Sequence, residues 1–138
     1  MAYATWLPVE PGADVWDLVP GARDALRALY SSLWHAGVDG ELLERCRRRV
    51  DALIAGLPTD DDAGRPEPER AALGFAEQYV IDPHGVTDAQ AETLHRLFTP
   101  EELAALTTAL ATFDALARVR AVLGAVPGVP ATIDITAS

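Results

Sequence analysis

Three side chains in the middle of this 138-residue chain have the types needed for acid–base chemistry. Glu44 borders the apolar positions of a segment with helical periodicity, Glu77 lies near the end of another, and His84 follows shortly after it. A partly buried carboxylate can have a raised pKa, and a histidine near a carboxylate can act as a general base near neutral pH. If the three converge, they could decarboxylate or isomerise a small organic acid or carbonyl compound.

Each of these residues also has a purely structural interpretation. Glu44 precedes Arg48 by four residues, which is the spacing of an ion pair on one helix face. His84 follows Asp82 and Pro83, so it could belong to a turn in which the Asp82 carboxylate accepts a backbone N–H group. The sequence does not show whether Glu44, Glu77 and His84 meet in space, and both interpretations stay open.

Cys46 is the single cysteine of the chain. It excludes an internal disulfide, a two-cysteine redox centre and a cysteine-rich zinc site. Neighbouring arginines could stabilise its thiolate, but it also lies on an apolar helix face, where a cysteine behaves as a small inert hydrophobe. The run Asp60-Asp61-Asp62 lacks the spacing of a calcium-binding loop. We expect no metal and no other cofactor.

The charge balance opposes some classes of partner. The chain has 21 acidic and 11 basic residues, a net charge of −10, whereas nucleic-acid binding requires a basic surface. The arginines concentrate at Arg45 and 47–49, close to Glu41, Glu44 and Asp51. We interpret this cluster as a solvated, salt-bridged surface, with an anion site as the alternative.

The sequence favours neither a membrane location nor export. No apolar run approaches the roughly 20 residues of a membrane-spanning helix. The first residues lack a basic segment followed by an apolar stretch, so we expect a cytoplasmic protein. The absence of lysine and asparagine, with many alanines and arginines, indicates a GC-rich genome such as that of an actinobacterium.

Apolar residues recur with helical spacing and predict an all-α fold of about five helices. The expected helices span 22–36, 40–55, 69–81, 87–98 and 100–123. The start signals are strongest at Thr87 and Thr99, each of which is followed three residues later by Gln or Glu, as in a capping box. Gly56 is a plausible end of the second helix, and the proline-rich acidic stretch 57–68 predicts a solvated loop.

The same pattern divides the chain into three parts. Residues 1–21 are expected to form an extended N-terminal arm, 22–124 the helical domain and 125–138 a C-terminal tail. Five short amphipathic helices cannot bury every apolar face within one chain of this length. We therefore expect a homo-oligomer, either a dimer, a trimer or a hexamer.

Two segments carry a resemblance to a known family. The stretch ELLERCRRRVDALIAG, residues 41–56, resembles the helix that precedes the redox site in alkylhydroperoxidase D-like proteins, members of the carboxymuconolactone decarboxylase superfamily. Residues 69–124, with the pieces AALGFAEQYV, GVTDAQ, FTPEEL and FDALARVRAVLG, resemble the C-terminal part of such proteins. The resemblance covers roughly 22–124 and implies the helical bundle of that family.

The resemblance also shows a gap where the family has its chemistry. Redox members carry a glutamate on this helix and a Cys-x-x-Cys-x-x-x-His motif that begins twelve residues later. Glu44 matches that glutamate, but Gly56, Thr59 and Ala63 stand where the two cysteines and the histidine would be. Peroxidase activity is therefore not expected, and the lactone decarboxylase branch also uses a histidine that is missing here.

Two functional hypotheses remain. The first is a non-redox acid–base enzyme or small-molecule binder, with Glu44, Glu77 and His84 as its working groups and a small organic acid or carbonyl compound as its substrate. The second is a non-catalytic helical oligomer that serves another enzyme.

Overall fold

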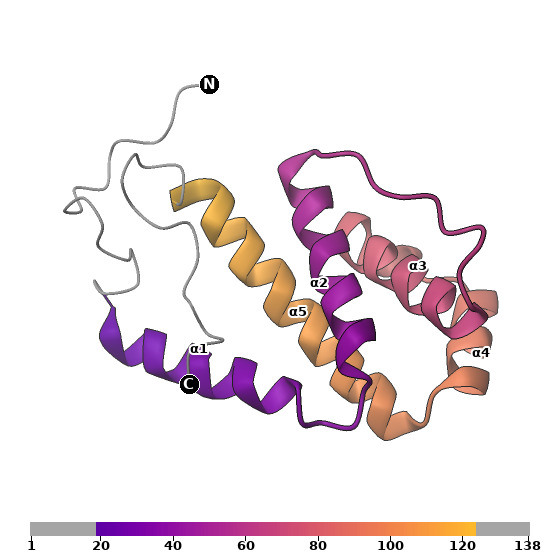
Figure 1. Ribbon diagram of the computed structural model, residues 1–138, viewed down its shortest axis with the longest axis horizontal. Coiled ribbons are helices and arrows are strands. Elements are labelled where there is room, and N and C mark those ends of the chain that lie inside the picture. The colour runs from indigo at the N-terminus through magenta and orange to yellow at the C-terminus, as the bar shows by residue number, and fades with distance from the viewer. Residues whose placement is uncertain (1–18, 124–138) are drawn as a thin grey trace.

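The computed structural model describes residues 19–123 and shows an all-α architecture, as expected (Figure 1). The elements are α1 (Pro20–Leu33), α2 (Gly40–Ala55), α3 (Glu67–Ile81), the short 3₁₀ helix η2 (Pro83–Gly85), α4 (Asp88–Leu97) and α5 (Pro100–Leu123). None of the described residues forms a strand. No described helix combines the length and the apolar character needed to cross a membrane.

The boundaries differ from the expected ones at two helix starts and at the end of α1, which stops at Leu33, three residues before the expected end at 36. Both α1 and α3 begin two residues earlier than predicted, and each has a proline in its first turn, where the missing N–H group costs nothing. The arm and tail expected at 1–21 and 125–138 lie almost entirely outside the described residues.

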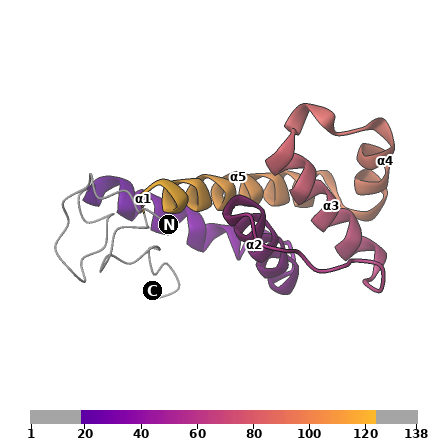
Figure 2. The same ribbon diagram turned by 90° about the horizontal axis from the view of Figure 1, so that it is seen from above.

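Helix α2 lies at the centre of the arrangement. It packs against α5 on one side and against α3 on the other, and α4 packs against both α3 and α5. Figure 2 shows α5 running along the molecule, with α1 towards its C-terminal end and α3 and α4 towards its N-terminal end. The connection between α2 and α3 starts at the end of this central helix.

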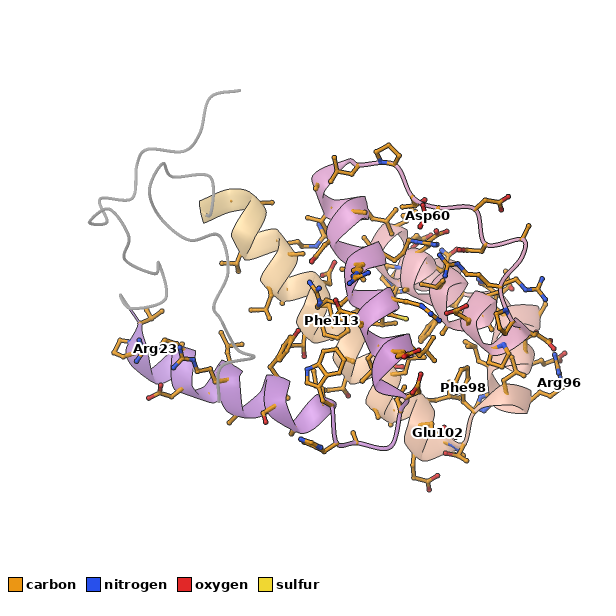
Figure 3. The ribbon with its side chains drawn as sticks, viewed as in Figure 1. Arg23, Asp60, Arg96, Phe98, Glu102 and Phe113 are labelled. Carbon is orange, nitrogen blue, oxygen red and sulfur yellow. The ribbon has the colours of Figure 1, made fainter. Side chains whose placement is uncertain are left out.

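The core is formed by the inner faces of α2, α3 and α5. Its largest fully enclosed side chains are Phe113, Leu43, Leu73, Leu106, Leu110, Val50 and Cys46. Helix α1 joins this core through aromatic rings: Tyr30 and Trp34 both pack against Phe113, with ring centroids 6.0 and 6.2 Å away (Figure 3). Aromatic contacts at such distances add to the free energy gained by burial alone.

The predicted helix-start signals are confirmed in detail. Thr87 accepts a hydrogen bond from the Gln90 backbone N–H, and the Gln90 side chain accepts one from the Thr87 N–H, each at 3.1 Å. Thr99 and Glu102 make the same reciprocal pair at 3.0 and 3.1 Å. Gly56 ends α2 in the left-handed conformation, with φ of 70°.

Substitutions at two glycines should change the free energy of unfolding in opposite directions. Gly56→Ala should lower the free energy of unfolding by about 1 kcal/mol, because a residue with a Cβ is strained at this positive φ. Gly74→Ala, in the interior of α3 with open space around the added Cβ, should raise it by about 0.5 kcal/mol. Urea denaturation of the two variants measures both effects, and changes of the same sign would contradict this account.

Candidate functional site

The α2–α3 connection contains the positions at which the sequence resemblance places a redox motif. Residues 56–66 contain no helix and run as an irregular loop from the end of α2 to the start of α3 (Figure 1). This confirms the expected loop, apart from its last two residues, which begin α3. We call residues 57–66 the acidic loop.

Arg49 fastens the acidic loop to both helices. Its side chain is only 5% exposed. Nη1 and Nη2 each donate a hydrogen bond to the Asp62 carboxylate, at 2.9 and 2.6 Å, and Nη1 also donates to Glu77 Oε1 at 2.6 Å. One guanidinium group therefore joins α2, the acidic loop and α3.

This arrangement corrects the expectation that the arginines of α2 form a solvated surface. That interpretation is wrong for Arg49, because α3 and the acidic loop cover its face of α2. It holds for Arg48, which is 73% exposed, and for the expected pairing of Arg47 with Glu44 and Asp51. Burial of Arg49 is tolerated because carboxylates from two other segments surround it.

A second buried charge extends the same cluster. Glu69, at the start of α3, is 7% exposed and forms an ion pair with Arg45. Arg65 lies between the two groups: its Nε donates to Asp62 at 3.0 Å, and its Nη1 lies 3.8 Å from Glu69. We call Arg45, Arg49, Asp62, Arg65, Glu69 and Glu77 the ion network.

The pair of Asp62 and Arg49 within the network favours the charged form of both groups. The hydrogen bond from Arg49 lowers the pKa of Asp62 below its usual value, with a smaller contribution from Arg65 and against an opposing effect of burial. The same bond, together with the one to Glu77, raises the pKa of Arg49. Asp62 and Arg49 are thus charged at neutral pH.

A cavity of about 400 Å³ opens beside the network, between α2, the acidic loop and α3. Its lining consists of Arg45, Arg48, Arg49, Ala52, Pro58, Thr59, Asp60, Arg65 and Leu73. We call it the arginine cavity. Thr59, which matches the second motif cysteine in the resemblance, is part of this lining. The cavity therefore lies where the sequence resemblance would place the redox motif.

Several N–H groups at the arginine cavity have no hydrogen-bond partner among the described residues. Arg48 uses its Nε to donate to Glu44 at 3.2 Å, and its terminal nitrogens make no such bond. The terminal nitrogens of Arg65 lie 3.7 Å from Asp60 and 3.8 Å from Glu69, which is beyond hydrogen-bond distance. These donors are available to an anion that enters the cavity.

Glu44 adopts its structural alternative. Its carboxylate accepts hydrogen bonds from Arg47 Nε at 2.9 Å and from Arg48 Nε at 3.2 Å, so the ion pair with Arg48 is confirmed. The hydrogen bond from Arg47 is the largest cause of a lowered pKa at Glu44, and Arg48 adds to it. A carboxylate held in this way stays ionised at neutral pH.

Glu77 and His84 occupy separate positions. Glu77 belongs to the ion network, with its side chain 36% exposed. His84 is exposed in η2, where its backbone N–H donates to the Asp82 carboxylate at 3.1 Å, as the turn interpretation expects. Among the described residues, no hydrogen bond or ion pair joins Glu44, Glu77 and His84, and none of the three lines the arginine cavity. Their catalytic roles stay a prediction.

Cys46 has the packing role. Its side chain is fully buried in the core, and burial raises the pKa of its thiol to about 12 despite the nearby charge of Arg49. At that pKa almost no thiolate forms at neutral pH, and the thiolate is the reactive form.

The sequence singled out Glu77 and the arginine cluster, with an anion site as the alternative for the cluster, but it indicated neither the burial of Arg49 nor its pairing with Asp62 and Glu77. Arg49 follows Cys46 by three residues and so lies on the apolar face of α2, which is the signal that could have indicated its burial. Its partners were not identifiable, because Asp62 and Glu77 are 13 and 28 residues away in sequence.

The helix order and packing define an alkylhydroperoxidase D-like fold, and a solved structure supports this class. A crystal structure of a protein of unknown function from Agrobacterium tumefaciens, provisionally described as the antioxidant defence protein AhpD, superimposes with a TM-score of 0.71 at 20% sequence identity. The match covers 87% of this chain and 99% of that one. No family model matches the sequence, and the curated proteins give no significant match. At this identity the likeness shows the fold, and the expected fold is confirmed.

The contribution of the ion network to stability should depend on pH. Asp62→Asn removes one charge from the partly buried pair with Arg49 and should lower the free energy of unfolding by about 2 kcal/mol at pH 7. The matched control Asp61→Asn, whose side chain only accepts the Ala63 N–H, should cost less than about 0.5 kcal/mol.

The pH dependence follows from the lowered pKa of Asp62. Between its folded and unfolded pKa values the unfolded chain binds more protons, so the pair's contribution is present at neutral pH and is lost as pH falls below about 4. The difference between wild type and Asp62→Asn should therefore shrink between pH 6 and pH 3 in denaturation series. A difference independent of pH would show that the charge of Asp62 is not responsible.

Proposed function

We propose that this chain binds a small organic acid in the arginine cavity and performs no thiol redox chemistry. The observation that carries the proposal is the composition of the cavity: four arginines and one aspartate line a space of about 400 Å³ at the place of the redox motif. Such a site would lie where the resembling family has its redox motif, with arginines and carboxylates in place of the reactive thiols and histidine.

The donors of the cavity suit a carboxylate. A guanidinium group presents parallel N–H groups that match the two oxygens of a carboxylate, and such charge-assisted bonds are stronger than neutral ones. Arg48 and Arg65 have terminal N–H groups that make no hydrogen bond among the described residues. Ala52 and Pro58 supply apolar surface for the hydrocarbon part of the ligand.

The described contacts favour binding over acid–base catalysis. A general acid or base works best with a pKa near the working pH. The pKa of Glu44 is lowered by Arg47, which moves it away from that range. Glu77 is engaged by Arg49. The sequence left open an acid–base enzyme or a small-molecule binder. Of these two, the enzyme built on Glu44, Glu77 and His84 is the less well supported.

The description of the Agrobacterium tumefaciens protein as an antioxidant defence protein is not extended to this chain. Its one cysteine is buried, and the pKa of that thiol is raised to about 12. The homo-oligomer expected from the sequence remains part of the proposal.

The proposal predicts a defined effect of Arg48, the most exposed of the four arginines that line the cavity. In an NMR titration with 4-methylpentanoate, a small branched acid, Arg48→Gln should weaken binding about fivefold through loss of a charged donor. The matched control is Arg70→Gln, which removes the same charge from an exposed arginine at a different groove, between α3 and α4. Its affinity should stay within about twofold of wild type.

Two results would contradict the proposal. One is the absence of saturable shifts at residues of the arginine cavity in the wild-type protein. The other is an equal loss of affinity in Arg48→Gln and Arg70→Gln, which would indicate a general effect of net charge.

A further inference from the structure

We infer that the acid bound in the arginine cavity is an α-amino acid, whose carboxylate meets the arginines and whose ammonium group meets Asp60. This inference rests on the proposed function and names the class of ligand. It starts from the one carboxylate in the lining of the cavity, which lies on the acidic loop (Figure 3).

Asp60 differs from the other two aspartates of the acidic loop. Asp62 is bound by Arg49 and Arg65, and Asp61 accepts a hydrogen bond from the Ala63 N–H at 3.0 Å. Asp60 is 88% exposed, and its only ion pair among the described residues is with Arg65, at 3.7 Å. Its carboxylate thus retains its capacity to accept hydrogen bonds at the cavity.

The short distance between Asp60 and Arg65 sets the spacing that a ligand must match. Arg65 can donate to the ligand's carboxylate, and Asp60 can accept from a cationic group. Arg65 Nη2 and Asp60 Oδ2 lie 3.7 Å apart. In an α-amino acid the carboxylate and the ammonium group are attached to the same carbon, so the two charges are equally close. A ligand with widely separated charges would not engage both residues.

Charge also argues against other acids. A simple carboxylic acid that binds Arg65 comes close to the Asp60 carboxylate and is repelled by it. A dicarboxylate brings a second negative charge to a site that already has Glu44, Asp62 and Glu69 paired to its arginines. An α-amino acid is neutral overall and meets each charge with its opposite. The apolar lining by Ala52 and Pro58 favours an aliphatic side chain.

The test compares two ligands of the same carbon skeleton on the full chain. Leucine and 4-methylpentanoate differ only in the amino group, so the ratio of their dissociation constants isolates its contribution. By NMR titration at neutral pH, wild type should bind leucine about threefold to fivefold more tightly than 4-methylpentanoate. Asp60→Asn should bring this ratio to about one, since the partner of the ammonium group and the repulsion of the simple acid are both lost.

The control is Asp61→Asn. It removes the same charge at the position next to Asp60, and the Asp61 side chain does not line the cavity. It should keep the wild-type ratio. Two results would overturn this inference alone. One is a preference for leucine that persists in Asp60→Asn. The other is a wild-type protein that binds 4-methylpentanoate in the cavity and shows no preference for leucine. A wild-type protein that binds neither probe would overturn the proposed function as well.

Discussion

A guanidinium group removed from water must meet carboxylates, because its charge and its N–H groups are costly to leave without partners. Arg49 satisfies this requirement with Asp62 from the acidic loop and Glu77 from α3. Because Asp62 belongs to the acidic loop, its bonds with Arg49 hold the loop against α2. Residues of this loop line one side of the arginine cavity.

The fold and the site are consequences of the same central helix. One face of α2 supplies Leu43, Cys46 and Val50 to the core, and burial of this face stabilises the packing against α3 and α5. Arg49 borders that face and converts the contact with α3 into a charged one. Within this AhpD-like fold, arginines and carboxylates line the connection between α2 and α3.

The parts of the structure that were predictable from the sequence are those governed by local interactions. Capping boxes at Thr87 and Thr99 and the ion pair of Glu44 with Arg48 each involve residues three or four positions apart, so spacing alone indicates them. The ion network was not predictable in this way. Its bonds join segments up to 28 residues apart, and their formation depends on how α3 is oriented against α2. The convergence of Glu44, Glu77 and His84 was a hypothesis of this non-local kind, and the described contacts pair the two glutamates with arginines.

The most direct test of the central claim is the coupling between Arg49 and Asp62, measured by a double-mutant cycle. Arg49→Met, Asp62→Asn and the combined variant are unfolded in urea and compared with wild type at pH 7. If this pair fastens the acidic loop to the core, the coupling free energy should be about 2 kcal/mol. A coupling below about 0.5 kcal/mol would show that the two residues act independently and would contradict the account.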